Sequence, residues 1–308
     1  MIDILSKRYF YFAISLIVIL PGIILLAVGG LPLSIDFTGG SLLEVQFEAG
    51  KSPQPADLVK LYEDAGIDDA QVTTTEGGSF VIRSSFLTNE TRDAVLDAMK
   101  TATGSEVSVI RFDSVGPSIG RQVTSRAGLA VAVAALAVVI YITAAFRKVP
   151  NAFRYGVCAV IAMIHDVSVV FSIAGIGALL FDWQMDALFL TALLTVIGFS
   201  VQDKVVVFDR IRENTNLLRR LEYEKLVNHS IVQTLQRSIN TQLMTVEFLL
   251  LALALFGGIT LQEFAVILLV GLFSGTYSSI FIAAPILVLW ENREWRNWFR
   301  KKEQSVTG

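Results

Sequence analysis

Six long apolar segments constrain the fold of this chain more than any other feature of its sequence. About 20 apolar residues are needed for a helix to cross the hydrocarbon core of a bilayer. Segments that meet this requirement lie at about 9–30, 125–146, 155–181, 187–208, 239–256 and 261–290. Apolar residues make up 53% of the chain and charged residues only 17%. The sequence therefore predicts a polytopic α-helical membrane protein with six transmembrane helices.

The distribution of basic residues predicts the orientation of these spans. If successive spans alternate in direction, the Lys and Arg residues of segments 7–8, 147–154, 210–225 and 293–302 all fall on one side. Cytoplasmic loops are enriched in Lys and Arg. We therefore expect a multi-pass protein of the cytoplasmic (inner) membrane with both termini in the cytoplasm. The first span follows Lys7 and Arg8 as in a signal peptide, but no small-residue cleavage site follows it, so we expect it to be retained.

Four parts are expected along the chain. Residues 1–30 form the cytoplasmic N-terminus and first transmembrane helix, and 31–120 form an extracytoplasmic domain. Residues 121–290 form a five-helix transmembrane bundle with a cytoplasmic segment at 209–238, and 291–308 form a basic cytoplasmic tail.

The extracytoplasmic block has the periodicity of a soluble α+β domain. Strand-like alternation at 41–47, 70–75, 79–83 and 106–113 is interrupted by helical spacing at 55–65 and 89–101. The order β-α-β-β-α-β is that of a ferredoxin-like domain. The block is acidic, which argues against a nucleic-acid partner. The only cysteine, Cys158, falls within a span, where we expect it to be buried.

Motifs for enzymatic chemistry are missing from the sequence. Ala49–Ser52 resembles the end of a phosphate-binding loop, but Val45 occupies the position of its first glycine. Neither zinc-ligand spacing nor a Ser/His/Asp set is present. We therefore expect a transport protein without catalytic chemistry, cofactor or metal.

Asp203 lies inside the fourth apolar segment. Carboxylates within spans cost roughly 2.5–3.5 kcal/mol on insertion scales, and they usually face other helices and mark a proton or ion path. The alternative is that Lys204 simply neutralises Asp203 near the cytoplasmic end of the span. On an ideal helix Ser200 and Val207 share the Asp203 face, so a basic partner on that face has to come from another span.

Polar residues with helical spacing also occur in two other spans. They are Arg237, Asn240, Thr241, Met244 and Glu247 in the fifth span, and His165, Ser168, Ser172 and Gly175, with Asp166 beside them, in the third. An arginine that approaches and leaves a buried carboxylate controls whether that carboxylate holds a proton. This pattern indicates a relay, whereas the alternative is that the polar residues only hold the spans together. In the last span, Gly271 and Gly275 predict close helix packing.

Six short motifs in order resemble the SecD/SecF family of the resistance-nodulation-division superfamily. They are Ile-Asp-Phe-Thr-Gly-Gly at 35–40, Val-Gly-Pro at 115–117, His165-Asp166, Val-Val-Val-Phe-Asp-Arg-Ile-Arg-Glu-Asn at 205–214, Thr-Leu-Gln-Arg-Ser at 234–238 and Gly-Thr-Tyr-Ser-Ser-Ile at 275–280. The resemblance covers nearly the whole chain.

The resemblance implies a SecD partner, a SecYEG channel complex, unfolded preprotein in transit and surrounding membrane lipid. It implies that the protonmotive force assists preprotein export across the cytoplasmic membrane. Asp203 resembles the coupling carboxylate and Arg237 its basic neighbour, with Asp166, His165 and Glu247 as possible relay residues. Asp36, with Thr38, Gly39 and Gly40, resembles the junction between span and external domain.

Two departures from the family pattern bear on these expectations. Ser34 precedes the glycine motif where Gly is usual, and Lys204 follows Asp203 where Thr or Ser is usual. A cation beside Asp203 would oppose proton uptake, unless Lys204 extends toward the cytoplasm.

Three functions compete. A proton-coupled auxiliary of protein export fits the resemblance best. A superfamily exporter of a lipid or small molecule is the alternative, but such a protein should have twelve spans and two large external domains. A passive scaffold that stabilises a translocase is the third. The sequence does not distinguish protons from sodium ions as the driving ion.

Overall fold

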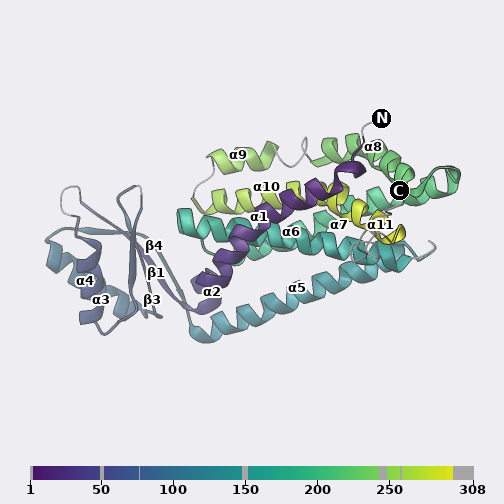
Figure 1. The fold of residues 1–308 in the computed structure, drawn as a ribbon. Helices are drawn as coiled ribbons and strands as arrows, with labels where there is room; N and C mark the ends of the chain where they lie inside the picture. The colour runs from purple at the N-terminus through teal and green to yellow at the C-terminus, as the bar shows by residue number, and fades with distance from the viewer. Residues whose placement is uncertain are drawn as a thin grey trace, which may run out of the picture. The chain divides into compact units, whose positions relative to one another are not determined.

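The structure is a computed structural model that describes residues 3–48, 52–75, 77–147, 152–242, 248–256 and 259–293. The chain divides into two compact units (Figure 1). Residues 33–129 form the smaller unit, and the segments before and after them form the larger, helical unit.

The smaller unit contains a four-stranded antiparallel sheet with two helices. Its elements are β1 (Gly40–Phe47), α3 (Pro55–Asp64), β2 (Gln71–Thr74), β3 (Phe80–Ser84), α4 (Asn89–Thr103) and β4 (Val107–Val115). The strand order is β2-β3-β1-β4, and every adjacent pair is antiparallel. These bounds confirm the predicted succession of strands and helices to within about two residues.

Alternation along the strands produces the core of this unit. Leu43, Val45 and Ile82 point to one face of the sheet and are completely or almost completely buried. That face is covered by apolar residues of α3 and α4, among them Leu58, Tyr62, Val95 and Met99. Burial of such side chains contributes about 1.5–3 kcal/mol each, which makes this apolar layer the main source of stability in the unit.

The glycine motif leads into β1 through a short helix, α2 (Ile35–Thr38). The Ser34 hydroxyl caps this helix by accepting a hydrogen bond from the Asp36 amide at 3.2 Å. Gly39 follows at φ 77° and Gly40 at φ 126°, conformations that glycine adopts readily. Ser34, which departs from the family pattern, therefore has a local structural role.

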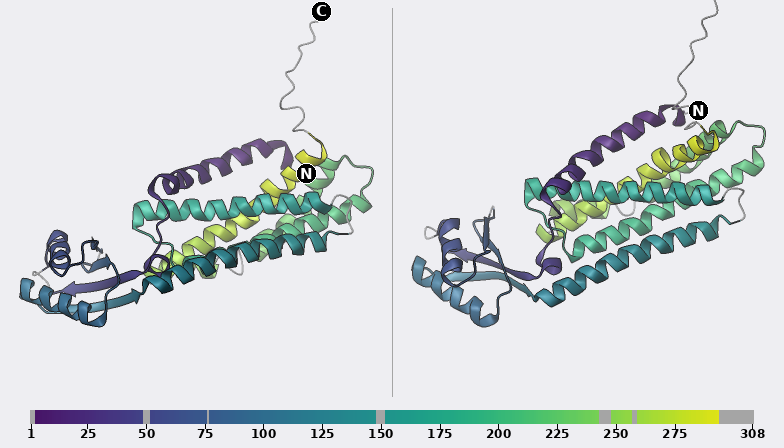
Figure 2. Two further views of the ribbon diagram at one scale, coloured as in Figure 1. Left: turned by 90° about the horizontal axis from the view of Figure 1, so that it is seen from below. Right: turned by 60° about the horizontal axis from the view of Figure 1, so that its bottom comes forward.

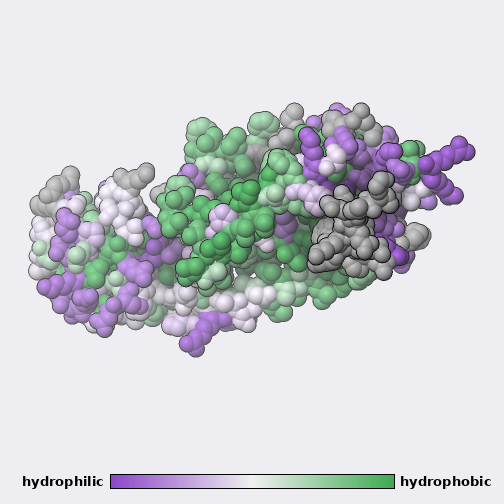
Figure 3. All heavy atoms as spheres, in the orientation of Figure 1, coloured by the Kyte–Doolittle hydropathy of each residue, from purple (hydrophilic) through white to green (hydrophobic). Residues whose placement is uncertain are grey.

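The larger unit consists of long helices that lie lengthwise beside one another (Figure 2). They are α1 (Arg8–Gly29) after the short η1 (Leu5–Lys7), the later part of α5 (Pro117–Ala145), α6 (Ala152–Phe181), α7 (Ala187–Leu217), α8 (Tyr223–Gln242), α9 (Phe248–Phe256), α10 (Ile259–Ser278), the π-helix η3 (Ser279–Ala283) and α11 (Ala284–Glu291). Apolar side chains cover much of their visible surface (Figure 3).

Five helices within the described residues are long and apolar enough to cross a membrane. They span Leu5–Gly29, Pro117–Ala145, Phe153–Phe181, Ala187–Leu217 and Leu261–Glu291. The other predicted span, 239–256, corresponds to the end of α8 and to α9, and residues 243–247 between them lie outside the described part of the chain.

Close contacts fix the arrangement of the larger unit. α10 packs against α6, α7 and α9, and α1 packs along α6. At the α1–α6 crossing the Ser172 hydroxyl donates to the Val18 carbonyl at 2.7 Å, and Gly22 leaves room for the backbone of Ser172. Cys158 is buried in the core of this unit, as predicted.

Both ends of the described larger unit are held at the same end of the helical bundle. The Ile4 amide donates to Asn228 at 2.9 Å, and Arg8 pairs with Glu224 at 2.8 Å, which ties the start of α1 to α8. Arg154 at the start of α6 forms an ion pair with Glu291 at the end of α11.

Candidate functional site: two buried carboxylates

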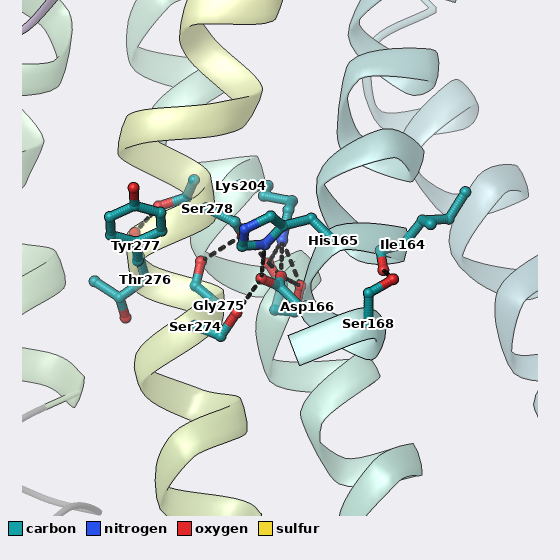
Figure 4. Close-up of polar contacts among 12 residues, drawn as sticks. Ile164, His165, Asp166, Ser168, Lys204, Ser274, Gly275, Thr276, Tyr277 and Ser278 are labelled. Carbon is teal, nitrogen blue, oxygen red and sulfur yellow. Dashed lines mark hydrogen bonds and ion pairs between the residues drawn. The ribbon is translucent and has the colours of Figure 1, made fainter. Parts of the chain in front are cut away.

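Asp166, in the middle of α6, is the centre of a buried polar network. Its carboxylate is 1% exposed. One oxygen, Oδ1, contacts the Ser274 hydroxyl at 2.7 Å and His165 Nδ1 at 3.1 Å. The other, Oδ2, accepts from the hydroxyls of Ser200 and Ser278 at 2.6 and 2.7 Å. These contacts come from α6, α7 and α10 (Figure 4), so Asp166 joins three helices.

Lys204 on α7 supplies the counter-charge of Asp166. Its side chain is 0% exposed, and Nζ lies 2.7 Å from Asp166 Oδ2. Nζ also donates to the Ser200 carbonyl at 3.2 Å and to the Ser200 hydroxyl. An ammonium has three N–H donors, and three oxygens accept them here. The interpretations in which Lys204 neutralises Asp203 or extends toward the cytoplasm are therefore wrong.

Asp203, the residue immediately before Lys204 on α7, forms a separate site. Its side chain is buried, and the residue is 8% exposed. Oδ1 accepts from the Ser238 hydroxyl of α8 at 2.7 Å, and Oδ2 accepts from the Ser279 hydroxyl at the start of η3. Within the described residues both partners of this carboxylate are neutral. π-helical turns are rare and occur frequently at functional sites.

The remaining predicted site residues lie around these two carboxylates. His165 stacks on Tyr277, with ring centroids 6.1 Å apart, while its Nδ1 faces Asp166. Arg237 is exposed on α8, next to the buried Ser238 that contacts Asp203. The pairing of Arg237 with Asp203 stays a prediction. Glu247 lies outside the described residues, so its proposed part in a relay is likewise a prediction.

The glycines of the last span bring α10 close to α7, which confirms the predicted packing. A Cβ atom at Gly271 would lie 2.2 Å from Val196, and one at Gly275 would lie 3.2 Å from the Ser200 Cα. This close approach places Ser274 and Ser278, which share one helix face, against Asp166. Sequence reasoning had assigned these serines no role, although their spacing of four residues was a usable signal.

The predicted junction residues lie together in the smaller unit. Thr38 donates to the Ser34 carbonyl at 3.1 Å, and Thr124 on α5 donates to the Phe37 carbonyl at 2.8 Å. A Cβ atom at Gly120 would lie 2.6 Å from the Gly39 amide nitrogen. The start of α5 and the glycine motif are thus in direct backbone contact, and Asp36 lies on α2, the short helix that forms the first part of this motif.

The described residues contain no group of three or more His, Cys, Asp and Glu side chains that could hold a metal ion.

These features define a class: a multi-pass helical membrane protein with an inserted α+β domain and ionisable groups buried between its spans. Comparisons with known proteins identify the family. The profile "Protein export membrane protein SecD/SecF, C-terminal" matches residues 95–293, and the "SecD/SecF GG Motif" profile matches residues 24–51. The chain belongs to the SecD/SecF family.

Named relatives cover the chain almost completely. The protein translocase subunit SecF of Anaerolinea thermophila is 68% identical over 98% of both chains. The subunit SecF of Thermobaculum terrenum is 46% identical over 99% of both chains. The crystal structure of Thermus thermophilus SecDF, titled a translocon-associated membrane protein, matches with a TM-score of 0.80 and 32% identity over 95% of this chain and 39% of that chain. The relatives are thus named as transport subunits.

Proposed function

We propose that this chain is an accessory subunit of the Sec preprotein translocase that uses the protonmotive force to assist protein export. In this proposal Asp203 is the coupling carboxylate and Arg237 is the basic residue that approaches it during the cycle. Support comes from the names of the relatives, which are translocase subunits SecF and SecDF. It also comes from the environment of Asp203.

The assignment of Asp203 as the coupling carboxylate rests on the difference between its surroundings and those of Asp166. Asp166 has a lysine ammonium within 2.7 Å and is bound by five side chains. Asp203 is bound in the described part of the chain by two serine hydroxyls, which stabilise either of its protonation states because a hydroxyl both donates and accepts. Asp203 is therefore the better candidate for binding and releasing a proton. A proton that crosses the membrane potential releases about 2.3 kcal/mol per 100 mV, enough to bias a conformational change.

The proposal includes the topology predicted from the sequence. Residues 239–256 provide the sixth crossing, with α9 packed against α10. The contacts of Ile4, Arg8 and Arg154 support both termini lying on one side, and the basic loops support that side being the cytoplasm. Residues 31–120 then form an extracytoplasmic domain, and its strand order β2-β3-β1-β4 supports a ferredoxin-like assignment.

The proposed partners follow from the relatives and from the lipid-facing surface. The Thermus thermophilus and Bacillus subtilis relatives are named SecDF and match this chain over 35% and 38% of their length. A separate SecD chain would supply the rest. α5 exposes Leu129, Val133, Leu136 and Ile140, an apolar stripe suited to lipid or to SecD. The SecYEG channel and unfolded preprotein complete the proposed assembly.

Preprotein import into inverted membrane vesicles tests the proposal. Vesicles carry SecD with either this chain or its Asp203→Asn variant, at saturating ATP, with and without an imposed proton gradient. The gradient should stimulate import only with the unchanged chain. A matched control is Asp209→Asn, which removes an exposed carboxylate from the same helix, where it pairs with Arg212 at 2.5 Å.

Equal stimulation of the Asp203→Asn vesicles would contradict the assignment and favour a scaffold role for the chain. Replacing the proton gradient by a sodium gradient in the same vesicles identifies the driving ion. Arg237→Met should abolish stimulation while the variant still co-purifies with SecD. Loss of co-purification would make Arg237 a structural residue instead.

A further inference from the structure

The oxygen atoms gathered at Asp166, where the Lys204 ammonium also binds, have the composition of a cation-binding site. Hard cations are bound by carboxylate, hydroxyl and backbone carbonyl oxygens, and in transporters such oxygens hold Na⁺ near the membrane midplane. Asp166, Ser200, Ser274 and Ser278 supply side-chain oxygens here, and Ser200 also supplies its carbonyl. The residue whose charged group occupies this cluster is Lys204.

We infer that the cluster of Asp166, Ser200, Ser274 and Ser278, called here the Asp166 cluster, is an alkali-cation site. In the natural chain the Lys204 ammonium takes the place of the free cation. The geometry around Nζ fits a bound ion rather than a chance surface pair. Its three donors meet three oxygens, and the side chain is 0% exposed. The cluster contributes one negative charge, so one monovalent cation makes it neutral, whereas a divalent ion would leave a buried excess charge.

Close helix packing also brings the oxygens of this cluster together. Gly275 lets α10 approach the Ser200 backbone, as its Cβ would lie 3.2 Å from the Ser200 Cα. Ser274 and Ser278 of α10 then face Asp166 across this contact (Figure 4). Serine hydroxyls rotate between donor and acceptor roles, so the oxygens that now donate to Asp166 can instead bind a free cation.

Two consequences follow from this assignment. Removing the ammonium while leaving its space open should create a site for a free alkali ion, because an unpaired buried carboxylate is costly and binding a cation relieves that cost. In the natural chain the attached ammonium should exclude free ions from Asp166. This second consequence, taken with the proposed function, leaves Asp203 as the place where the driving ion acts.

Thermal unfolding of the purified full-length chain in detergent tests the inference without relying on export activity. Unfolding temperatures are measured in NaCl, KCl and choline chloride at equal ionic strength. The unchanged chain should unfold at the same temperature in all three salts. Lys204→Ala should gain a saturable increase in unfolding temperature with Na⁺, K⁺ or both relative to choline, because a ligand that binds only the folded state stabilises it.

Two control variants separate cation binding from general effects of losing the ion pair. Lys204→Met also removes the charge, but its long apolar side chain fills the site, so it should show no cation-specific shift. Asp166→Asn combined with Lys204→Ala also removes the carboxylate charge of the described cluster and should abolish the shift. Equal unfolding temperatures for Lys204→Ala in all three salts would overturn the inference, as would an equal shift in Lys204→Met.

The inference can still be tested if Lys204→Ala does not fold in every salt. If Lys204→Ala aggregates in choline but is recovered as a monodisperse protein in Na⁺ or K⁺, the inference is supported. If it aggregates in every salt, Lys204→Ser is tested, because its hydroxyl adds one oxygen to the cluster. Aggregation of both variants in every salt overturns the inference, since a free cation would then be unable to replace the ammonium.

Discussion

The Lys204 ammonium lies 2.7 Å from the Asp166 carboxylate, although the two residues are 38 positions apart in the sequence. Both side chains are almost completely buried, so the pair joins α6 to α7 away from water. The hydroxyls of Ser200, Ser274 and Ser278, with His165 Nδ1, occupy the other binding positions of the carboxylate. Such a pair costs desolvation energy, which good geometry and further hydrogen bonds are needed to offset.

Breaking this pair from one side should destabilise the chain strongly. Asp166→Asn and Lys204→Met should each lower the free energy of unfolding by about 3–5 kcal/mol, because each leaves a buried charge without its partner. The double variant should lose much less than the sum of the two. Detergent-denaturant titrations of the three variants measure this coupling. Additive losses would show that the two side chains do not act as a pair.

Ser279 should support coupling at Asp203. Its hydroxyl donates to Asp203 Oδ2, and a hydrogen bond to a charged group is worth about 1.5–3 kcal/mol. Ser279→Ala should therefore reduce gradient-stimulated import while ATP-driven import without a gradient is unchanged. Ser168→Ala is the matched control, because among the described residues that hydroxyl bonds only to the carbonyl of Ile164 in its own helix, at 2.8 Å. Equal stimulation in both variants would remove Ser279 from the coupling site.

Gly120 should be required for the structure of the span–domain junction. A Cβ there would lie 2.6 Å from the Gly39 amide nitrogen, so Gly120→Ala must push α5 away from the glycine motif. We expect a loss of about 1–3 kcal/mol, as for other overpacked positions, and faster hydrogen exchange in β1 and β4 of the full chain. Gly116→Ala is the control, because nothing lies within 4 Å of its Cβ position. Similar exchange in the two variants would contradict this account.

Tyr62 should make the smaller unit sensitive to alkaline pH. Burial raises the pKa of the Tyr62 phenol, whereas in the unfolded chain the phenol titrates near pH 10. The unfolded state therefore loses this proton first, and stability should decline as the pH rises above about 10.

Tyr62→Phe should remove this part of the alkaline loss. The Tyr62 hydroxyl is buried without a hydrogen-bond partner in the described structure, so the variant should be at least as stable at neutral pH. Unfolding temperatures of both proteins across the alkaline range measure the difference. Parallel pH curves would show that Tyr62 does not titrate on unfolding.

Most of the fold could be predicted from the periodicity of apolar residues in the sequence. Alternation of apolar residues located β1 and β3 because one face of the sheet is buried, as with Leu43 and Val45. The spans of α1 and α6 were equally clear, because membrane helices are uniformly apolar over a long run. The segment 239–256 contains the polar residues Asn240, Thr241 and Glu247, which weaken its apolar pattern, and residues 243–247 lie outside the described part of the chain.

The contacts of the site were harder to predict than its residues. Asp203 and Lys204 are adjacent in sequence, yet successive side chains on a helix point about 100° apart, so they face different neighbours. Lys204 shares its face with Ser200, four residues earlier, and that face meets Asp166 and α10. Which helices lie against each face depends on tertiary packing. The π-turn at Ser279 has no periodic signal in the sequence either.

The last residue of α10, Ser278, and the first residue of η3, Ser279, bind different carboxylates. Ser278 donates to Asp166, and Ser279, one peptide unit further and inside the π-turn, donates to Asp203. A π-turn holds one residue more than an α-helical turn, and each α-helical residue occupies about 100° of rotation. Conversion of η3 to an α-helix would therefore swing α11 by about this angle and withdraw Ser279 from Asp203 while Ser278 kept its place. Interconversion of the two helix forms would thus alter the surroundings of Asp203 and leave the contact of Ser278 with Asp166 unchanged.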